Sequence, residues 1–220
     1  MKKNKASLYL LLFLSLALST LNSSLVHAQQ SASVLDEVSK RYDSYETLQT
    51  KFFLQVHGND GSEYQDEGTL YLDRKNNKYR VVLKQQEIIN DAKDTWTILK
   101  PEKEIQINEH LESQEGIGPQ NMFTFYKSGF KVEKTKQEKL DDGEVLTVVL
   151  LSPVDKTRNY KNITIRVNKN KHIHDVEILD KSGTTYIYTI MALYVNHKIP
   201  AHRFIFDKGK YPNFEIVDLR

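Results

Sequence analysis

The sequence predicts a mainly β protein: one antiparallel sheet that is strongly bent, with α-helices covering its concave apolar face. Three observations predict this fold class. About ten or eleven short segments with the period-two alternation of β-strands follow one another along the chain of 220 residues. Every connection between them has hairpin length, which favours antiparallel neighbours over βαβ units. A flat sheet of that width curls, and two short amphipathic segments are the candidates to cover its hollow side.

Residues 1–28 have the layout of a secretory signal peptide. Three lysines precede an apolar run at residues 8–18, and a small-residue exit ends at Ala28. The run is shorter than the roughly 20 apolar residues that span a membrane. We therefore expect cleavage after Ala28 and export to the periplasm as a soluble monomer. The mature chain, residues 29–220, is expected to form a single domain.

The elements of the mature chain begin with an amphipathic helix. Ser33 is a suitable cap, and apolar residues recur at spacings of three and four from Val34 to Tyr45. After Leu48 the spacing changes to two, which predicts a strand that ends before the turn-forming sequence Asn59-Asp60-Gly61. Later strands are expected at residues 68–72, 78–83, 87–90, 95–99, 104–108, 131–134, 145–151, 162–167, 176–180 and 185–190, with two last pieces at 203–207 and 215–217.

A break in the strand pattern contains the second helical segment. Residues 114–120 hold two glycines and a proline and are expected to form a loop. The apolar residues between Asn121 and Ser128 predict a short amphipathic helix, and Gly129 is a helix stop. The chain shows no internal repeat and no linker, which again indicates one domain.

Composition and motifs exclude several classes of protein. The chain has no cysteine, which rules out a disulfide framework, a thiolate metal site and a cysteine nucleophile. With 31 basic and 29 acidic residues, it lacks the basic excess of a general nucleic-acid-binding protein. The common hydrolase, phosphate-binding and zinc-protease motifs are absent from the sequence. We expect no enzyme, no catalytic residue, no metal and no cofactor; a hydrolase with dispersed catalytic residues is the alternative.

His172-Ile173-His174 is the best candidate for a metal site, because alternation places both imidazoles on one face of a strand. A zinc site needs a third or fourth ligand, and none lies nearby in the sequence. His197 and His202 could approach the pair only through the fold. We therefore interpret the two histidines as polar residues on the outer face of an edge strand.

Short motifs occur in an order that resembles one protein family. The longest is Ile88–Trp96, an aliphatic pair followed by an Asp-x-Lys turn and a tryptophan, with Ala92 where the family usually has glycine. The others are Thr50-Lys51-Phe52, Gly68–Leu72, Asn77–Arg80, Leu150–Pro153, Asp180–Thr184, and Asn196, Phe204, Phe206 and Pro212 near the C-terminus. Together they cover nearly the whole mature chain, which resembles the outer-membrane lipoprotein carrier family, the LolA-like periplasmic chaperones.

The resemblance implies an incomplete (half) β-barrel whose hollow binds acyl chains and whose helices form a lid. Trp96 would face the cavity together with Ile98, with a core tryptophan as the alternative, and Tyr79 would lie at the rim. The residues expected to line the apolar cavity are Phe52, Leu54, Leu70, Leu72, Tyr79, Val81, Leu83, Trp96 and Ile98. Those expected to form the lid are Val34, Leu35, Val38, Met122, Phe123 and Phe125.

Arg74 is the residue that the resemblance assigns as a latch for the lid. In the family, an Arg-Pro turn follows the strand that matches residues 68–72, and its arginine donates hydrogen bonds to backbone carbonyls of the lid. Arg74 stands in the matching place, but Lys75 replaces the proline and one residue is added before Tyr79. A solvated arginine in the turn is the alternative.

The function implied by the resemblance is that of a carrier in a Gram-negative periplasm, which takes lipoproteins by their acyl chains from the inner to the outer membrane. Its partners would be acylated lipoproteins, an inner-membrane lipoprotein-releasing transporter and an outer-membrane acceptor. At about 0.8 kcal/mol per methylene, exposing a chain of roughly sixteen carbons to water costs on the order of 12 kcal/mol. A binding protein for another lipid or glycolipid, and a lipoprotein-sensing regulator with the same fold, are the alternatives.

Overall fold

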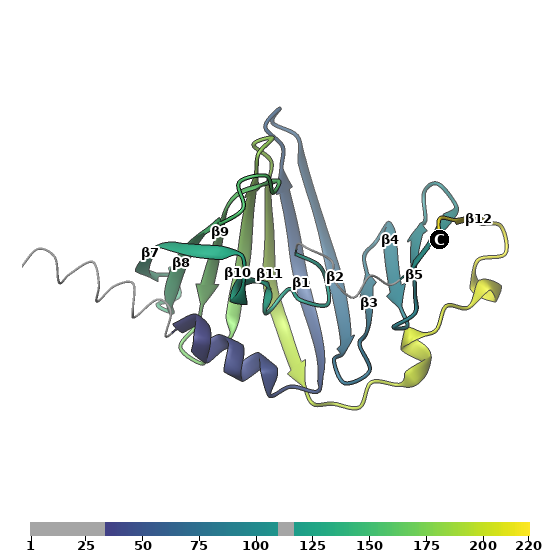
Figure 1. Ribbon diagram of the computed structural model, residues 1–220, viewed down its shortest axis with the longest axis horizontal. Coiled ribbons are helices and arrows are strands. Elements are labelled where there is room, and N and C mark those ends of the chain that lie inside the picture. The colour runs from purple at the N-terminus through teal and green to yellow at the C-terminus, as the bar shows by residue number, and fades with distance from the viewer. Residues whose placement is uncertain (1–33, 110–116) are drawn as a thin grey trace, which may run out of the picture.

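The computed structural model describes residues 34–109 and 117–220, in which twelve strands form one open sheet (Figure 1). The strand order is β12-β6-β5-β4-β3-β2-β1-β11-β10-β9-β8-β7. Neighbouring strands are antiparallel except for β12, which runs parallel to β6. The predicted mainly β class is confirmed. The predicted signal peptide and the cap at Ser33 lie outside the described residues.

Two meanders make up the sheet, and β11 joins them by pairing with β1. The first meander consists of β1 (Thr47–His57), β2 (Glu63–Asp73), β3 (Lys78–Val82), β4 (Gln86–Asn90), β5 (Asp94–Leu99) and β6 (Glu104–Glu109). The second consists of β7 (Phe130–Lys139), β8 (Val145–Pro153), β9 (Tyr160–Val167), β10 (Ile173–Asp180) and β11 (Thr185–Val195). The last strand, β12 (Glu215–Asp218), follows two 3-10 turns, η2 (Ala201–Phe204) and η3 (Lys208–Lys210).

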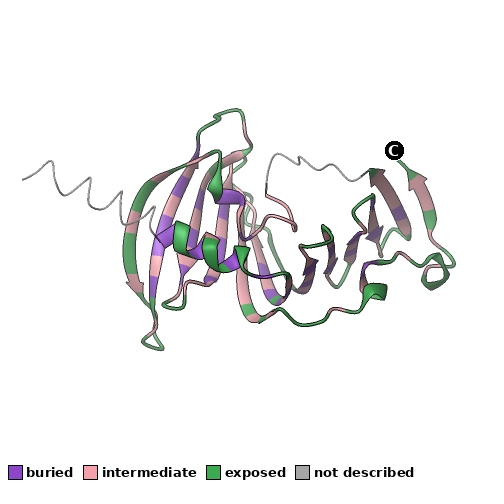
Figure 2. Ribbon diagram, turned by 60° about the horizontal axis from the view of Figure 1, so that its bottom comes forward, coloured by how far each residue is buried: buried purple, intermediate pink, exposed green. Residues whose placement is uncertain are grey.

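The N-terminal helix lies in the hollow of the more strongly curved half of the sheet, formed by β7–β11 with β1 and β2 (Figures 1 and 2). Its described part covers residues 34–43. Val34, Leu35 and Val38 are buried, whereas the other face of the helix is exposed, as the spacing of apolar residues predicts. We call the face of the sheet that carries this helix the inner face, and the opposite one the outer face.

Two predicted elements are wrong. Residues 121–128 form turns and one short 3-10 helix, η1 (Phe125–Lys127), where a longer helix was expected. Aromatic and β-branched residues in this segment have low helix propensity, and η1 has no side-chain cap. Residues 203–207 were expected as a strand, but they form the end of η2 and an unpaired extended stretch. The expected helix stop, Gly129, has a φ of 79° and does end the segment.

The apolar residues gather in two clusters on opposite faces of the sheet. The larger cluster lies on the inner face and includes the N-terminal helix, residues 117–130 and inner-face side chains of β1–β3 and β8–β11. The smaller one contains Ile89, Ile98 and Ile105, with Trp96 and aromatic residues of the C-terminal segment packed against them. In the sequence-based prediction, this second cluster has a counterpart only in the alternative reading of Trp96 as a core residue.

Candidate functional site

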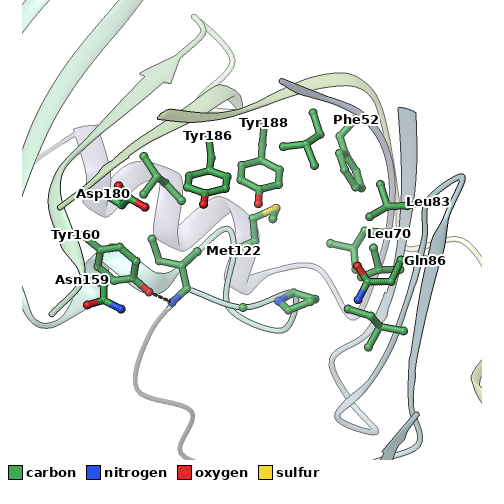
Figure 3. A pocket seen from close by; sticks show the side chains of 17 residues that line it. Phe52, Leu70, Leu83, Gln86, Met122, Asn159, Tyr160, Asp180, Tyr186 and Tyr188 are labelled. Atoms are coloured by element: carbon green, nitrogen blue, oxygen red, sulfur yellow. Dashed lines mark hydrogen bonds between the residues drawn. The ribbon is translucent and has the colours of Figure 1, made fainter. Parts of the chain in front are cut away.

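A cavity of about 520 Å³ lies on the inner face of the sheet, between its strands and a segment that contains residues 117–119 and Met122 (Figure 3). Its two side walls come from different halves of the sheet. One wall comes from β1–β4, and the other from the ends of β9, β10 and β11.

The wall from β1–β4 is apolar, because alternate residues of each strand point to the same face. Its members are Phe52, Leu54, Leu70, Val81, Leu83 and Ile88, with Gln86 beside them. The register places them side by side: Leu70 pairs with Val81, and Val81 pairs with Ile88.

Gly68 gives Phe52 the room it needs in this wall. The two residues are paired across β1 and β2, and the ring of Phe52 lies over the glycine. A Cβ atom at position 68 would stand 2.2 Å from the Cζ atom of Phe52, which is a clash. The glycine of the Gly68–Leu72 motif therefore fixes where the aromatic ring meets the cavity.

The wall from β9–β11 is more polar. It contains Asn159, Tyr160, Asp180, Tyr186 and Tyr188, together with Ile178. The hydroxyl of Tyr160 accepts a hydrogen bond of 3.1 Å from the backbone N–H of Ile117. Tyr160 thereby ties the segment across the cavity to the sheet.

The N-terminal helix fills the hollow beside the cavity and is held there by Tyr42. The Tyr42 ring is fully buried and stacks on Phe123, with ring centroids 4.6 Å apart. Its hydroxyl accepts a hydrogen bond of 3.2 Å from the backbone N–H of Ile173, and burial raises the pKa of Tyr42 well above its usual range. Phe123 in turn lies in the segment that covers the cavity, so the helix and this segment pack on each other. We call the helix and residues 117–130 the lid segments, after the role that the family resemblance implies.

Two further contacts hold the same lid elements together. The hydroxyl of Tyr45, just after the helix, lies 2.8 Å from Nε2 of His172. Ser39 donates a hydrogen bond of 3.3 Å to the hydroxyl of Tyr126, and burial raises the pKa of Tyr126 to about 12. A small number of polar groups thus hold the helix to the start of β10 and to the second lid segment.

Arg74 joins the turn between β2 and β3 to the end of the helix. Its guanidinium donates to the backbone carbonyl of Tyr42, and its Nη2 atom donates to Oδ1 of Asp43 at 3.0 Å. Lys127 pairs with the other oxygen of Asp43. Partial burial opposes ionisation of Asp43, but hydrogen bonds from Lys127 and Arg74 lower its pKa. A contact between Arg74 and the lid carbonyl is therefore present, although proline is absent from the turn.

The structure brings together most of the residues that the sequence suggested for the site. Phe52, Leu54, Leu70, Val81, Leu83 and Met122 line the cavity. Leu72, Val34, Leu35, Val38, Phe123 and Phe125 belong to the same inner cluster without lining it.

The expected placement of Trp96 and Ile98 in the cavity is wrong. The register pairs Trp96 with Ile89 and Ile89 with Arg80, so these side chains lie on the face opposite to Val81. Trp96 stacks on Phe206 of the C-terminal segment, with centroids 5.4 Å apart. Trp96 is half-buried against the outer cluster, which is closer to the structural alternative that the sequence left open than to a place in the cavity.

Tyr79 faces the inner side, as expected, but it does not lie at the rim. It is only 4% exposed and belongs to the inner cluster. Burial raises its pKa, and a hydrogen bond with Thr95 partly offsets that rise. The rim assignment is wrong because the Tyr79 side chain is buried in the inner cluster and does not line the cavity.

The sequence did not point to Tyr160, Tyr186 and Tyr188 as site residues. Alternation in 185–190 was sufficient to place the two tyrosines of β11 on one face. Their pairing with Leu54 and Val56 of β1, which makes that face the inner one, depends on the return of β11 to β1. That pairing joins segments far apart in the chain.

His172 and His174 do not share a face in the way expected. β10 is an internal strand, and its pairing with β9 is irregular between Ile173 and Asp175. His172 contacts Tyr45, whereas Nδ1 of His174 lies 2.7 Å from Asp175. Within residues 34–109 and 117–220, no group of three His, Asp or Glu side chains is placed to hold a metal ion. No helix in these ranges is long and apolar enough to cross a membrane.

Comparison with solved structures found several similar chains, and the first of those described below supports this architecture. A solved structure described as an uncharacterized conserved protein from Thermus thermophilus has a TM-score of 0.55 at 12% identity, covering 86% of this chain and 99% of that one. A LolA superfamily protein from Nitrosomonas europaea has a TM-score of 0.42 at 14% identity, covering 82% and 98%. The lipoprotein LppX from Mycobacterium tuberculosis has a TM-score of 0.48 at 10% identity, covering 77% and 98%.

No curated protein matches the sequence. A family model does: the model described as outer membrane lipoprotein carrier protein LolA matches residues 43–207. The matched region runs from the end of the N-terminal helix past β11 and contains every residue that lines the cavity. The chain belongs to the LolA family.

Proposed function

We propose that the protein is a periplasmic carrier that binds the acyl chains of lipoproteins in the cavity and takes them from the inner to the outer membrane. The observation that carries this proposal is the apolar wall of β1–β4 facing a cavity of about 520 Å³. That volume lies within the roughly 300–1,000 Å³ of ligand sites. Membership of the LolA family supports lipoproteins as the cargo.

The lid explains how such a carrier both binds and releases. Side chains of the helix and of residues 117–130 pack on the same inner face that would receive an acyl chain. Lid and cargo therefore compete for one apolar surface. The net binding free energy is the free energy gained by burying the acyl chain minus the free energy lost when the lid side chains leave that surface. If the ion pairs of Asp43 with Arg74 and Lys127 break, the lid can move away from the sheet. The cavity then extends along the inner face that the lid had covered. No covalent chemistry is required.

The sequence of residues 1–28 supports export, and a carrier in the periplasm needs partners at both membranes. We assign acylated lipoproteins as cargo, an inner-membrane lipoprotein-releasing transporter as donor and an outer-membrane acceptor as recipient. The carrier works as a monomer, because one chain supplies both the cavity and the lid.

The first experiment tests acyl binding to the purified mature protein. A synthetic dipalmitoylated lipopeptide should displace N-phenyl-1-naphthylamine, a neutral apolar dye, from the cavity. Leu83→Glu puts a charge into the cavity wall and should weaken dye and lipopeptide binding at least tenfold. Gln85→Glu adds the same charge at an exposed position nearby and serves as the matched control. Equal binding by both variants would contradict the proposed site.

The second experiment tests transport in cells. Depletion of the protein should shift lipoproteins from the outer-membrane to the inner-membrane fraction, and the wild-type gene should restore the distribution. Mass spectrometry of ligands that co-purify with the protein gives the independent readout. A distribution unaffected by depletion, together with a co-purified glycolipid, would replace the lipoprotein by another lipid as cargo.

A further inference from the structure

The cavity is divided into an apolar and a polar side. β1–β4 supply only hydrocarbon and aromatic groups to their wall, apart from Gln86 (Figure 3). Tyr160, Tyr186, Tyr188, Asn159 and Asp180 bring hydroxyl, amide and carboxylate groups to the opposite side. A cavity that took only acyl chains would have no use for this second set, since each polar group there raises the cost of excluding water.

Tyr186 and Tyr188 stand at the centre of the polar side. Both are on β11, where they pair with Val56 and Leu54 of β1 and therefore point to the inner face. Their hydroxyls point into the cavity (Figure 3). In the part of the chain that the structure describes, no hydrogen bond to either hydroxyl is present. Burial raises the pKa of Tyr188, with smaller contributions from Tyr186 and Tyr160, so the Tyr188 phenol remains a neutral donor.

The remaining groups extend the polar side toward the turn between β10 and β11. The Tyr160 hydroxyl accepts from Ile117 and keeps its own proton to donate. Oδ1 of Asp180 accepts from Ser182 at 2.6 Å and from the N–H of Thr184 at 2.9 Å. The hydrogen bond from Ser182 is the main cause that lowers the pKa of Asp180, which makes it a carboxylate at neutral pH. A ligand at this end meets phenol donors and one negative charge.

We propose that the polar side is a headgroup subsite, which selects acyl ligands whose polar end carries hydroxyl or amide groups and no negative charge. The acyl chain lies against β1–β4, and the headgroup exchanges hydrogen bonds with Tyr186 and Tyr188 while Asp180 repels anionic phosphates. This inference rests on the proposed acyl binding. Two sources share this chemistry: the acylated N-terminus of a lipoprotein and the sugar of a neutral glycolipid.

The experiment compares four probes by displacement of N-phenyl-1-naphthylamine from the mature protein. Methyl palmitate offers only an acyl chain, whereas a dipalmitoylated lipopeptide with an acetylated N-terminus and an uncharged peptide, and a monogalactosyl diacylglycerol, add the two neutral headgroups. Dipalmitoyl phosphatidic acid adds an anionic one. The wild-type protein should bind both neutral-headgroup probes more tightly than methyl palmitate and phosphatidic acid, and the tighter of the two identifies the source.

The double variant Tyr186→Phe/Tyr188→Phe removes two hydroxyls and keeps both rings. Its affinity for the neutral-headgroup probes should fall about tenfold or more, with binding of methyl palmitate unchanged. Tyr194→Phe, on the same strand but paired with Gln49 on the outer face, is the matched control and should bind as the wild type does. Asp180→Asn removes the repelling negative charge and should reduce the difference in affinity between phosphatidic acid and the neutral lipids.

The outcomes separate this inference from the proposed function. If the double variant binds the lipopeptide and the galactolipid as tightly as the wild type, the headgroup subsite is refuted, while acyl binding stands. If none of the four probes displaces the dye from the wild-type protein, the proposed acyl binding itself fails. Thermal unfolding of each variant confirms that the rings still pack.

Discussion

The two apolar clusters meet at β4 but are covered in different ways. Along β4, Ile88 lines the inner cavity and its neighbour Ile89 is fully buried in the outer cluster. The inner face is covered by lid elements that leave a cavity. The outer face of β3–β6 is covered by the C-terminal segment, whose rings Phe206 and Tyr211 stack from Trp96 outward. On the proposed function, the inner face exchanges its cover for a ligand, whereas the outer face is packed as a core.

Polar contacts strengthen this difference. On the outer face, Arg80 and Glu87 form an ion pair whose side chains are only 12% and 7% exposed. Tyr211 donates a hydrogen bond of 3.0 Å to Glu87, and Arg80 donates to the backbone carbonyl of Arg203 at 3.0 Å. The ion pairs that hold the lid, Arg74 and Lys127 with Asp43, are 30–43% exposed. Water screens the lid contacts but not the outer ones.

The largest effect is expected from breaking the buried pair. Glu87→Ala leaves the Arg80 guanidinium buried without its partner and removes the acceptor of Tyr211, so the free energy of unfolding should fall by about 3–5 kcal/mol. Urea unfolding measures the loss. Lys131→Ala, in an exposed pair with Glu133, is the control and should change stability by less than about 1 kcal/mol. Similar losses for the two variants would remove the distinction between the faces.

A second comparison uses one aliphatic truncation on each face. Ile98→Ala empties a fully buried position of the outer cluster and should cost about 2–4 kcal/mol of stability with no change in dye binding. Leu83→Ala, in the cavity wall, should cost less stability and change dye affinity, because the position already borders open space. Urea unfolding and dye titration of the two variants give both readouts. Altered dye binding in Ile98→Ala would place the outer cluster in the ligand path.

A smaller effect is expected at the lid. Arg74→Ala removes charge-assisted hydrogen bonds to Tyr42 and Asp43, and should lower stability by about 1 kcal/mol because the site is partly exposed. The same loss makes lid opening easier, so ligand affinity should rise and not fall. Stopped-flow dye binding measures the opening directly. Lys75→Ala, in the same turn but exposed, is the control.

The smallest effect concerns pH. Burial is the main cause that lowers the pKa of His172, with the charge of Arg41 adding to it. A folded-state pKa below the unfolded value of about 6.5 means that the unfolded chain binds the proton more readily. Stability should therefore be complete above pH 6.5 and decline as the pH falls below it. Urea midpoints between pH 7.5 and 5 should decline less for His172→Gln than for the wild type.

The sequence was informative about elements and not about which face each strand buries. Alternation shows that Trp96 and Ile98 share a face. Because Ile88 and Ile89 make β4 apolar on both faces, alternation alone does not show whether the face of Trp96 is the inner or the outer one. The alternating Phe204 and Phe206 led to the wrong prediction of a strand at 203–207, because alternation does not show whether a segment is paired in a sheet. Alternating burial marks an extended segment with one side packed, whether or not its backbone is paired.

Of the two walls of the cavity, only the apolar one could be predicted from the sequence. Its apolar wall follows from local strand patterns in β1–β3, which pair with their neighbours in the chain. The polar wall depends on the long-range pairing of β11 with β1 and on the position of Ile117 against Tyr160. Such contacts have no local signature, and the tyrosines involved fit a sheet surface as well as they fit a binding site.

The parallel pairing of β12 with β6 has a consequence for the order of folding. Glu215 pairs with Glu104, and the whole second meander lies between them in the chain. Contacts of such long sequence separation form late in folding. Until they do, β6 is an open edge and the outer faces of Ile89, Ile98 and Ile105 are bare. The folding chain therefore passes through a stage in which an aggregation-prone surface is exposed on its outer face. Docking of the C-terminal segment covers that surface and pairs the open edge of β6.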